Sequence, residues 1–84
     1  METKITFEEY LRKENLSENT ITSYLWTVNY FNANYDVVSK ENLLAYKGYL
    51  MEFFKPKTVN LRIQAINKYL EYSEEQHLQI KAVK

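Results

Sequence analysis

Hydrophobic side chains recur at helical spacing in four successive stretches of the chain, and short polar segments separate these stretches. Apolar positions three and four residues apart fall on one face of an α-helix, so the spacing predicts helices at about residues 7–13, 18–34, 40–54 and 58–76. No stretch shows the alternating β-branched pattern that is typical of a strand. The pattern therefore predicts an all-α fold, a compact bundle of four amphipathic helices.

Polar residues at the expected helix starts agree with these boundaries. The hydroxyls of Thr6, Ser17 and Ser39 can each accept a backbone N–H that the first helical turn leaves unpaired. Glu9 follows Thr6 by three residues, which is the spacing of a capping box. Pro56 disfavours helical geometry in the residue before it, so it places the end of the third helix.

The end of the chain differs from the rest, because residues 77–84 show no clear periodicity. We expect residues 1–76 to form one domain and residues 77–84 to begin a linker to a further domain that this chain does not contain. A length of 84 residues fits a single small domain of this kind.

Composition excludes several classes of site. The chain has no cysteine and a single histidine, so a disulfide or a thiolate metal site is excluded and a zinc site is not expected. We expect no metal and no cofactor. The N-terminus is polar and no apolar run approaches the ~20 residues of a membrane span, so we expect a cytoplasmic protein without a membrane partner.

The net charge is zero, with 11 basic and 11 acidic residues, but the charges are not evenly distributed. Residues 53–70 contain four basic side chains and no acidic one. These are Lys55, Lys57, Arg62 and Lys68.

Two helix starts carry distinctive motifs, LSENTITSY at residues 16–24 and KTVNLRI at residues 57–63. With TFEEYL at residues 6–11 and SKENLLAY at residues 39–46, they form an ordered set over nearly the whole chain. This set resembles the N-terminal, SAM-like core-binding domain of tyrosine recombinases, which include phage integrases and Xer-type recombinases. Leu61 and Asn67 depart from it, since relatives often carry basic residues there.

The resemblance implies that the domain lies on one face of duplex DNA at a recombination site. It implies that the protein's own C-terminal catalytic domain closes over the other face, and that further recombinase protomers bind the same DNA. The nucleophilic tyrosine would belong to that catalytic domain. No tyrosine in this chain is accompanied by the arginine and histidine residues that such a reaction needs, so we do not expect this chain to be an enzyme.

In the family, the second and fourth helices present their N-terminal halves to DNA. Hydroxyl and amide side chains there suit phosphates and sugars, the basic side chains would release counterions, and asparagine, glutamine and arginine could contact base edges. The tyrosine can bury its ring and keep its hydroxyl at the surface. The candidate DNA-binding residues are Asn19, Thr20, Ser23, Tyr24, Lys55, Lys57, Thr58, Asn60, Arg62, Gln64 and Lys68.

Other interpretations of the same residues stay open. Thr20 and Ser23 are equally compatible with solvated positions, and Arg62 with a salt bridge to an acid of another helix. Helical spacing places Trp26 and Tyr30 away from the core, as a small apolar patch. Either the catalytic domain or another protomer contacts this patch, or the chain ends cover it. The alternative function is a helical protein–protein interaction module without DNA binding.

Overall fold

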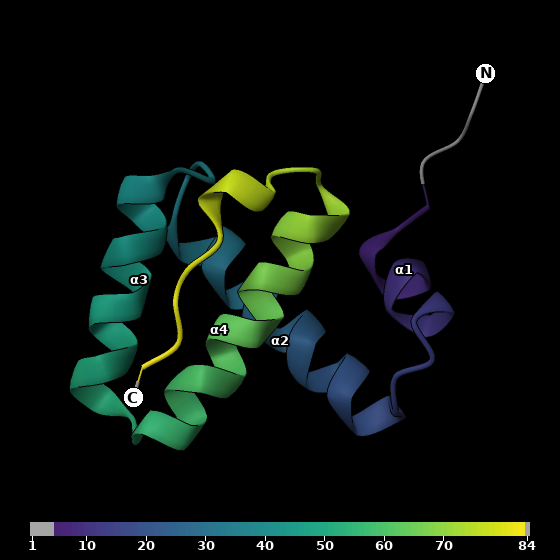
Figure 1. Ribbon diagram of the computed structural model, residues 1–84, viewed down its shortest axis with the longest axis horizontal. Helices are drawn as coiled ribbons and strands as arrows, with labels where there is room; N and C mark the ends of the chain where they lie inside the picture. The colour runs from purple at the N-terminus through teal and green to yellow at the C-terminus, as the bar shows by residue number, and fades with distance from the viewer. Residues whose placement is uncertain (1–4, 84) are drawn as a thin grey trace.

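Four α-helices and one short 3₁₀ helix form the fold that the computed structural model describes for residues 5–83 (Figure 1). No strand occurs in this range, so the prediction of an all-α fold with four helices is confirmed. The elements are α1 (Phe7–Lys13), α2 (Glu18–Asn34), α3 (Lys40–Phe53), α4 (Pro56–Tyr72) and η1 (Gln76–Leu78).

The first two helices begin and end where the spacing predicts, and the other two differ at their ends. The helix α3 ends at Phe53, one residue earlier than expected. The helix α4 begins at Pro56 instead of Thr58, because proline fits the first turn, where its missing N–H would be unpaired anyway. It ends at Tyr72 instead of Gln76, and Glu74 then adopts a positive φ of 61° that turns the chain.

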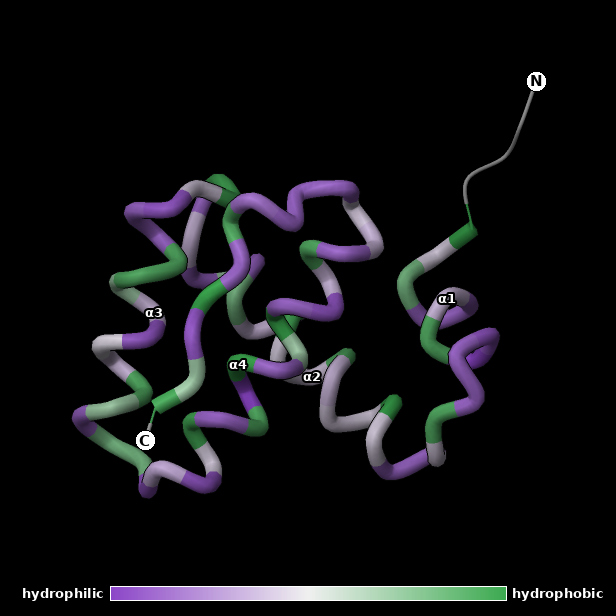
Figure 2. The backbone as a smooth tube through the Cα atoms, viewed as in Figure 1, coloured by the Kyte–Doolittle hydropathy of each residue, from purple (hydrophilic) through white to green (hydrophobic). Residues whose placement is uncertain are grey.

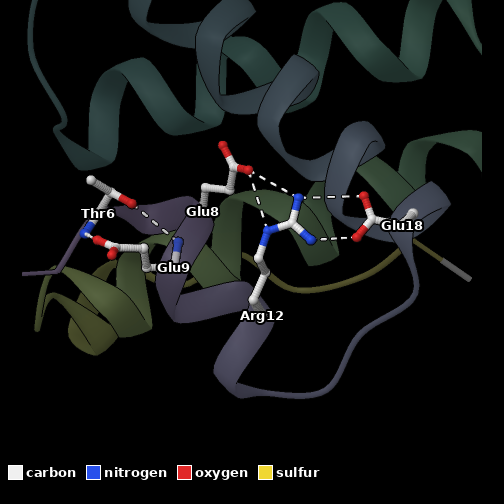
Figure 3. Close-up of polar contacts among 5 residues, drawn as sticks. All are labelled: Thr6, Glu8, Glu9, Arg12 and Glu18. Atoms are coloured by element: carbon white, nitrogen blue, oxygen red, sulfur yellow. Dashed lines mark hydrogen bonds and ion pairs between the residues drawn. The ribbon is translucent and has the colours of Figure 1, made fainter.

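The expected caps are present. Thr6 Oγ1 accepts the backbone N–H of Glu9 at 3.1 Å, and the Glu9 carboxylate accepts the backbone N–H of Thr6 at 2.9 Å (Figure 3). These two bonds complete the capping box. Ser17 and Ser39 each accept a backbone N–H from the residue three positions later, both at 3.2 Å.

The hydrophobic core lies where α4 meets the other helices, and apolar residues recur along each helix on the tube of Figure 2. α1 is attached to α4 by aromatic rings: Phe7 packs edge-on against Tyr69, with centroids 5.2 Å apart. The Tyr10 hydroxyl donates a hydrogen bond to Glu71 at 2.8 Å, which adds a polar contact between the same two helices. The most deeply buried side chains come from all four helices and include Leu11, Phe31, Leu43, Tyr46, Val59, Ile66 and Leu70.

The C-terminal segment, residues 79–83, runs back from η1 between α3 and α4 (Figure 1). Two asparagine side chains of α4 hold it. The Asn67 amide donates to the Ile80 carbonyl at 2.8 Å and accepts the Ile80 N–H at 2.8 Å. The Asn60 amide makes the same pair of bonds with Val83, at 2.8 and 2.7 Å. The expected linker stays a prediction, and up to Val83 the chain packs on the helical domain.

The spacing of the two asparagines explains why both pairs form at once. Asn60 and Asn67 are seven residues apart on α4, a rise of about 10.5 Å at ~1.5 Å per residue. Ile80 and Val83 are three residues apart in non-helical chain, which spans about 10 Å when extended. The helix and the segment therefore present matching donor and acceptor pairs in register.

This register generates a prediction for stability. Replacing Asn67 with Ala leaves the partly buried Ile80 N–H and carbonyl without partners, so we expect the free energy of unfolding to fall by about 1–3 kcal/mol. Urea unfolding followed by circular dichroism measures this loss, and hydrogen exchange at the Ile80 amide should accelerate. Gln64→Ala, an exposed change on the same helix, should stay within about 0.5 kcal/mol of the wild type. Equal stability of both variants would contradict this role of Asn67.

Candidate nucleic-acid interface

An open hollow of about 270 Å³ lies between the first half of α2 and the first half of α4. The packing of α2 across α4 positions both walls. The hollow brings together five of the candidate residues that the sequence identified, from two helices that are distant in the chain. Its lining consists of Asn19, Thr20, Ser23, Tyr24, Leu61 and Gln64.

The polar side chains of this hollow differ in how they are held. Thr20 is tied to the helix cap, since its Oγ1 accepts the Ser17 hydroxyl at 3.0 Å. Asn19 and Gln64 are exposed, and neither amide is hydrogen-bonded to another of residues 5–83. Their donors and acceptors are therefore available to a ligand. Tyr24 packs its ring against the core and is half-buried.

The basic candidates are arranged differently, and none of them lines the hollow. Lys68 lies between two acids, with its Nζ 2.8 Å from Glu14 and 3.5 Å from Glu71. The hydrogen bond to Glu14 is the main cause of a raised pKa of Lys68. Its charge is thus largely compensated within the domain.

Arg62 also has partners within the domain. Its guanidinium lies over the ring of Trp26, 4.5 Å from the centroid, and its Nη1 donates to Thr27 Oγ1 at 3.1 Å. The salt bridge to an acid that the sequence left open is not among the ion pairs of residues 5–83. Asn60 binds Val83, so its amide is not available for a base edge.

Lys55, Lys57 and Thr58 occupy the start of α4. The two lysines are exposed and form no ion pair with the described part of the chain. Lys57 precedes Leu61 by four residues and Gln64 by seven, so it lies on the face of α4 that borders the hollow. Thr58 is half-buried and outside the hollow.

A carboxylate cluster beside the hollow was not identified from the sequence. Glu18 directly precedes Asn19 and pairs with Arg12, whose Nη2 also lies 3.0 Å from the carboxylate of Glu8 (Figure 3). The hydrogen bond from Arg12 lowers the pKa of Glu18 and raises that of Arg12. The sequence could have predicted the Glu8–Arg12 pair, because residues four apart are neighbours on a helix. It could not have predicted the contact with Glu18, because that contact depends on the turn between α1 and α2.

A second surface is aromatic, and we call it the aromatic surface: Trp26, Tyr30, Tyr49, Phe53 and Phe54. Trp26 is 53% exposed and stacks on Tyr30, with centroids 5.6 Å apart. Tyr30 stacks on Tyr49 at 6.0 Å, and Tyr49 meets Phe53, which is 65% exposed, at 5.2 Å. The sequence identified the two members from α2, but Tyr30 is half-buried against the core instead of pointing away from it. α3 supplies Tyr49 and Phe53, and its C-cap residue is Phe54.

Residues 5–83 contain neither a metal-holding group nor a membrane-spanning helix. No group of histidine, cysteine and acidic side chains there could hold a metal ion. In the same range, no helix has the length and apolar character that crossing a membrane requires.

Comparisons with known proteins give no match: no family model, no curated protein and no solved structure is similar to this chain.

The pairing of Arg12 generates a pH prediction. A carboxylate whose pKa is lowered in the folded state adds stability above its ordinary pKa of about 4.5 and loses it as the pH falls through the folded value. In Arg12→Gln, we expect the pKa of Glu18 to return toward its ordinary value and the acid-induced loss of stability to become smaller. NMR titration of the side-chain carboxyl carbons measures this change.

Two controls accompany the Arg12→Gln titration. The pKa of Glu9 is lowered by its bonds to Thr6, not by Arg12, so it should stay low in the variant. Lys13→Gln removes a neighbouring charge that forms no ion pair with the described residues and should leave Glu18 unchanged. A pKa of Glu18 that is the same in Arg12→Gln and in the wild type would contradict the pairing.

Proposed function

We propose that this chain is the DNA-binding, SAM-like core-binding domain of a site-specific tyrosine recombinase that acts in DNA integration or recombination. It binds one face of duplex DNA through α2 and α4. The observation that carries the proposal is the hollow in which Asn19, Thr20, Ser23 and Gln64 converge from these two helices. Asn19, Thr20 and Ser23 belong to the segment 16–24 that carries the sequence resemblance, and Gln64 directly follows the second such segment, 57–63.

The chemistry of this surface suits DNA. Exposed asparagine and glutamine amides can each donate to and accept from adenine in the major groove, so Asn19 and Gln64 are the base-reading candidates. Thr20 and Ser23 add hydroxyls that can donate to phosphate oxygens. The free backbone N–H groups at the start of α4 carry a partial positive charge that favours an anion.

Few basic residues are available to bind phosphates, so we expect electrostatic attraction to contribute only modestly to the affinity for DNA. Lys55 and Lys57 are the basic candidates that have neither an ion pair nor an aromatic partner among residues 5–83. Lys68 is paired with acids, and Arg62 lies over Trp26. Arg12 compensates Glu18, the acid closest in sequence to Asn19, and so reduces its repulsion of phosphate. In this proposal, Lys55 and Lys57 face DNA, while Arg12 and Lys68 stabilise the fold through their ion pairs.

In this proposal, strand cleavage belongs to the protein's own C-terminal catalytic domain, and other protomers occupy the same recombination site. The core-binding domain positions the duplex without a cofactor. A second candidate function is a helical protein–protein interaction module, which the exposed aromatic surface favours because large apolar patches are typical of interfaces.

If Lys55 and Lys57 are the cations that contact phosphates, they determine how strongly DNA binding depends on salt. Each neutralised phosphate contributes about −0.9 to the slope of log K against log salt, so two lysines should give a slope of about −1.8. In Lys55→Gln/Lys57→Gln, we expect weaker binding and a slope close to zero. Fluorescence anisotropy with a labelled duplex between about 50 and 200 mM salt measures both quantities.

A charge-matched control tests whether position matters in this experiment. Lys13→Gln/Lys40→Gln removes the same net charge from α1 and the start of α3, away from the hollow. It should keep the wild-type slope. If this control flattens the slope as much as the Lys55 and Lys57 variant does, the binding is nonspecific and the proposed surface is wrong.

An NMR titration with duplex DNA separates the two candidate functions. We expect salt-sensitive chemical-shift changes at Asn19, Thr20 and Gln64 that exceed any change at Trp26, since Trp26 is not among the residues that line the hollow. Asn19→Ala with Gln64→Ala should weaken binding without changing the salt slope, because amides release no counterions. Changes confined to Trp26 and its neighbours, or no change at low salt, would contradict DNA binding through α2 and α4.

A further inference from the structure

A second hollow, of about 280 Å³, lies between α3 and the C-terminal segment. Lys40 and Lys47 line it from α3, and His77 and Lys81 line it from the other side. It exists only because the segment after η1 packs back on the bundle, which places these two parts of the chain side by side (Figure 1). No pattern in the sequence groups these residues.

The charged side chains that line this hollow are all basic. The whole chain has equal numbers of acidic and basic residues, yet no acidic side chain is among those that line the hollow. Lys40, Lys47 and Lys81 form no ion pair with the part of the chain that the structure describes. A concave surface lined by one sign of charge concentrates its field, so this hollow attracts anions.

The remaining lining is largely apolar. Leu43 and Ile80 belong to the core and are almost completely buried. Leu44, which is 52% exposed, and Leu78, which is half-buried, extend this apolar lining. A ligand that fits both parts needs an apolar body as well as a negative charge.

The walls are held in place before any ligand binds. Lys47 Nζ donates to the Lys81 carbonyl at 2.8 Å, which joins the two sides of the hollow. An ammonium has three donors, so two remain for an anion. Asn67 fixes Ile80 through two hydrogen bonds, and a site that is already ordered loses less entropy when it binds.

From these features we infer that the hollow binds a small organic anion. Its carboxylate or phosphate lies among the lysines, and its short apolar body lies against the leucine and isoleucine side chains. The volume is close to the lower end of small-molecule sites, about 300 Å³, which indicates a ligand of a few carbon atoms. The site shares no residue with the hollow between α2 and α4, so either proposal can fail without the other.

The test uses three probes that separate charge from apolar contact: hexanoate, inorganic phosphate and 1-hexanol. In ¹H–¹⁵N NMR titrations of the full chain, hexanoate should produce saturable changes at residues 40–47 and 77–81. It should bind at least about tenfold more tightly than 1-hexanol, because charge-assisted hydrogen bonds are lost with the alcohol. Equal affinity for hexanoate and 1-hexanol, or no saturation with hexanoate, would overturn the inference.

Phosphate and two variants complete the design. Inorganic phosphate should bind the same residues more weakly than hexanoate, since it lacks the apolar body, and tighter phosphate binding would overturn the apolar part of the inference. Lys47→Gln should weaken hexanoate binding about tenfold, whereas Lys13→Gln on α1 should not. Leu44→Glu changes an exposed side chain and should abolish binding by repulsion with the fold intact, so retained binding in this variant would also overturn it.

Discussion

The packing of α2 across α4 is the contact on which the rest of the structure depends. The buried stripe of α4 consists of Val59, Ile63, Ile66 and Leu70, which meet the core residues of the other helices. Burying one such side chain stabilises a protein by ~1.5–3 kcal/mol, so the stripe accounts for roughly 6–12 kcal/mol before entropy is subtracted. That is comparable with the entire net stability of a small domain, about 5–15 kcal/mol. The same contact brings together the two walls of the candidate DNA surface.

Hydrogen bonds from α4, in addition to apolar packing, hold the C-terminal segment in place. In the C-terminal segment, Ile80 is buried and Val83 packs against the core, but apolar contacts alone do not fix the direction of a chain. The amides of Asn60 and Asn67 supply that direction, because each satisfies a backbone donor and a backbone acceptor at once. With the segment in place, Lys47 reaches Lys81 and a second hollow forms.

Pairing of charges decides which basic residues can act on a ligand. Arg12 and Lys68 are bound to acids of neighbouring elements, and Arg62 lies against Trp26. A neutral chain can still present positive surfaces, since four acids are paired with Arg12 or Lys68 while several lysines have no ion pair among residues 5–83. In the proposed DNA complex, this leaves Lys55 and Lys57 as the residues that set the salt dependence.

The sequence by itself determined the helices, their caps and the core stripes, because periodicity and capping are local properties of the chain. Asn19, Thr20, Ser23 and Gln64 could also be chosen from the sequence, and their convergence follows the expected pairing of the second and fourth helices. Only the tertiary structure decided the rest. It directed Asn60 to Val83, Arg62 to Trp26 and Lys68 to Glu14, because a side chain's partner across the bundle depends on distances that no local pattern contains.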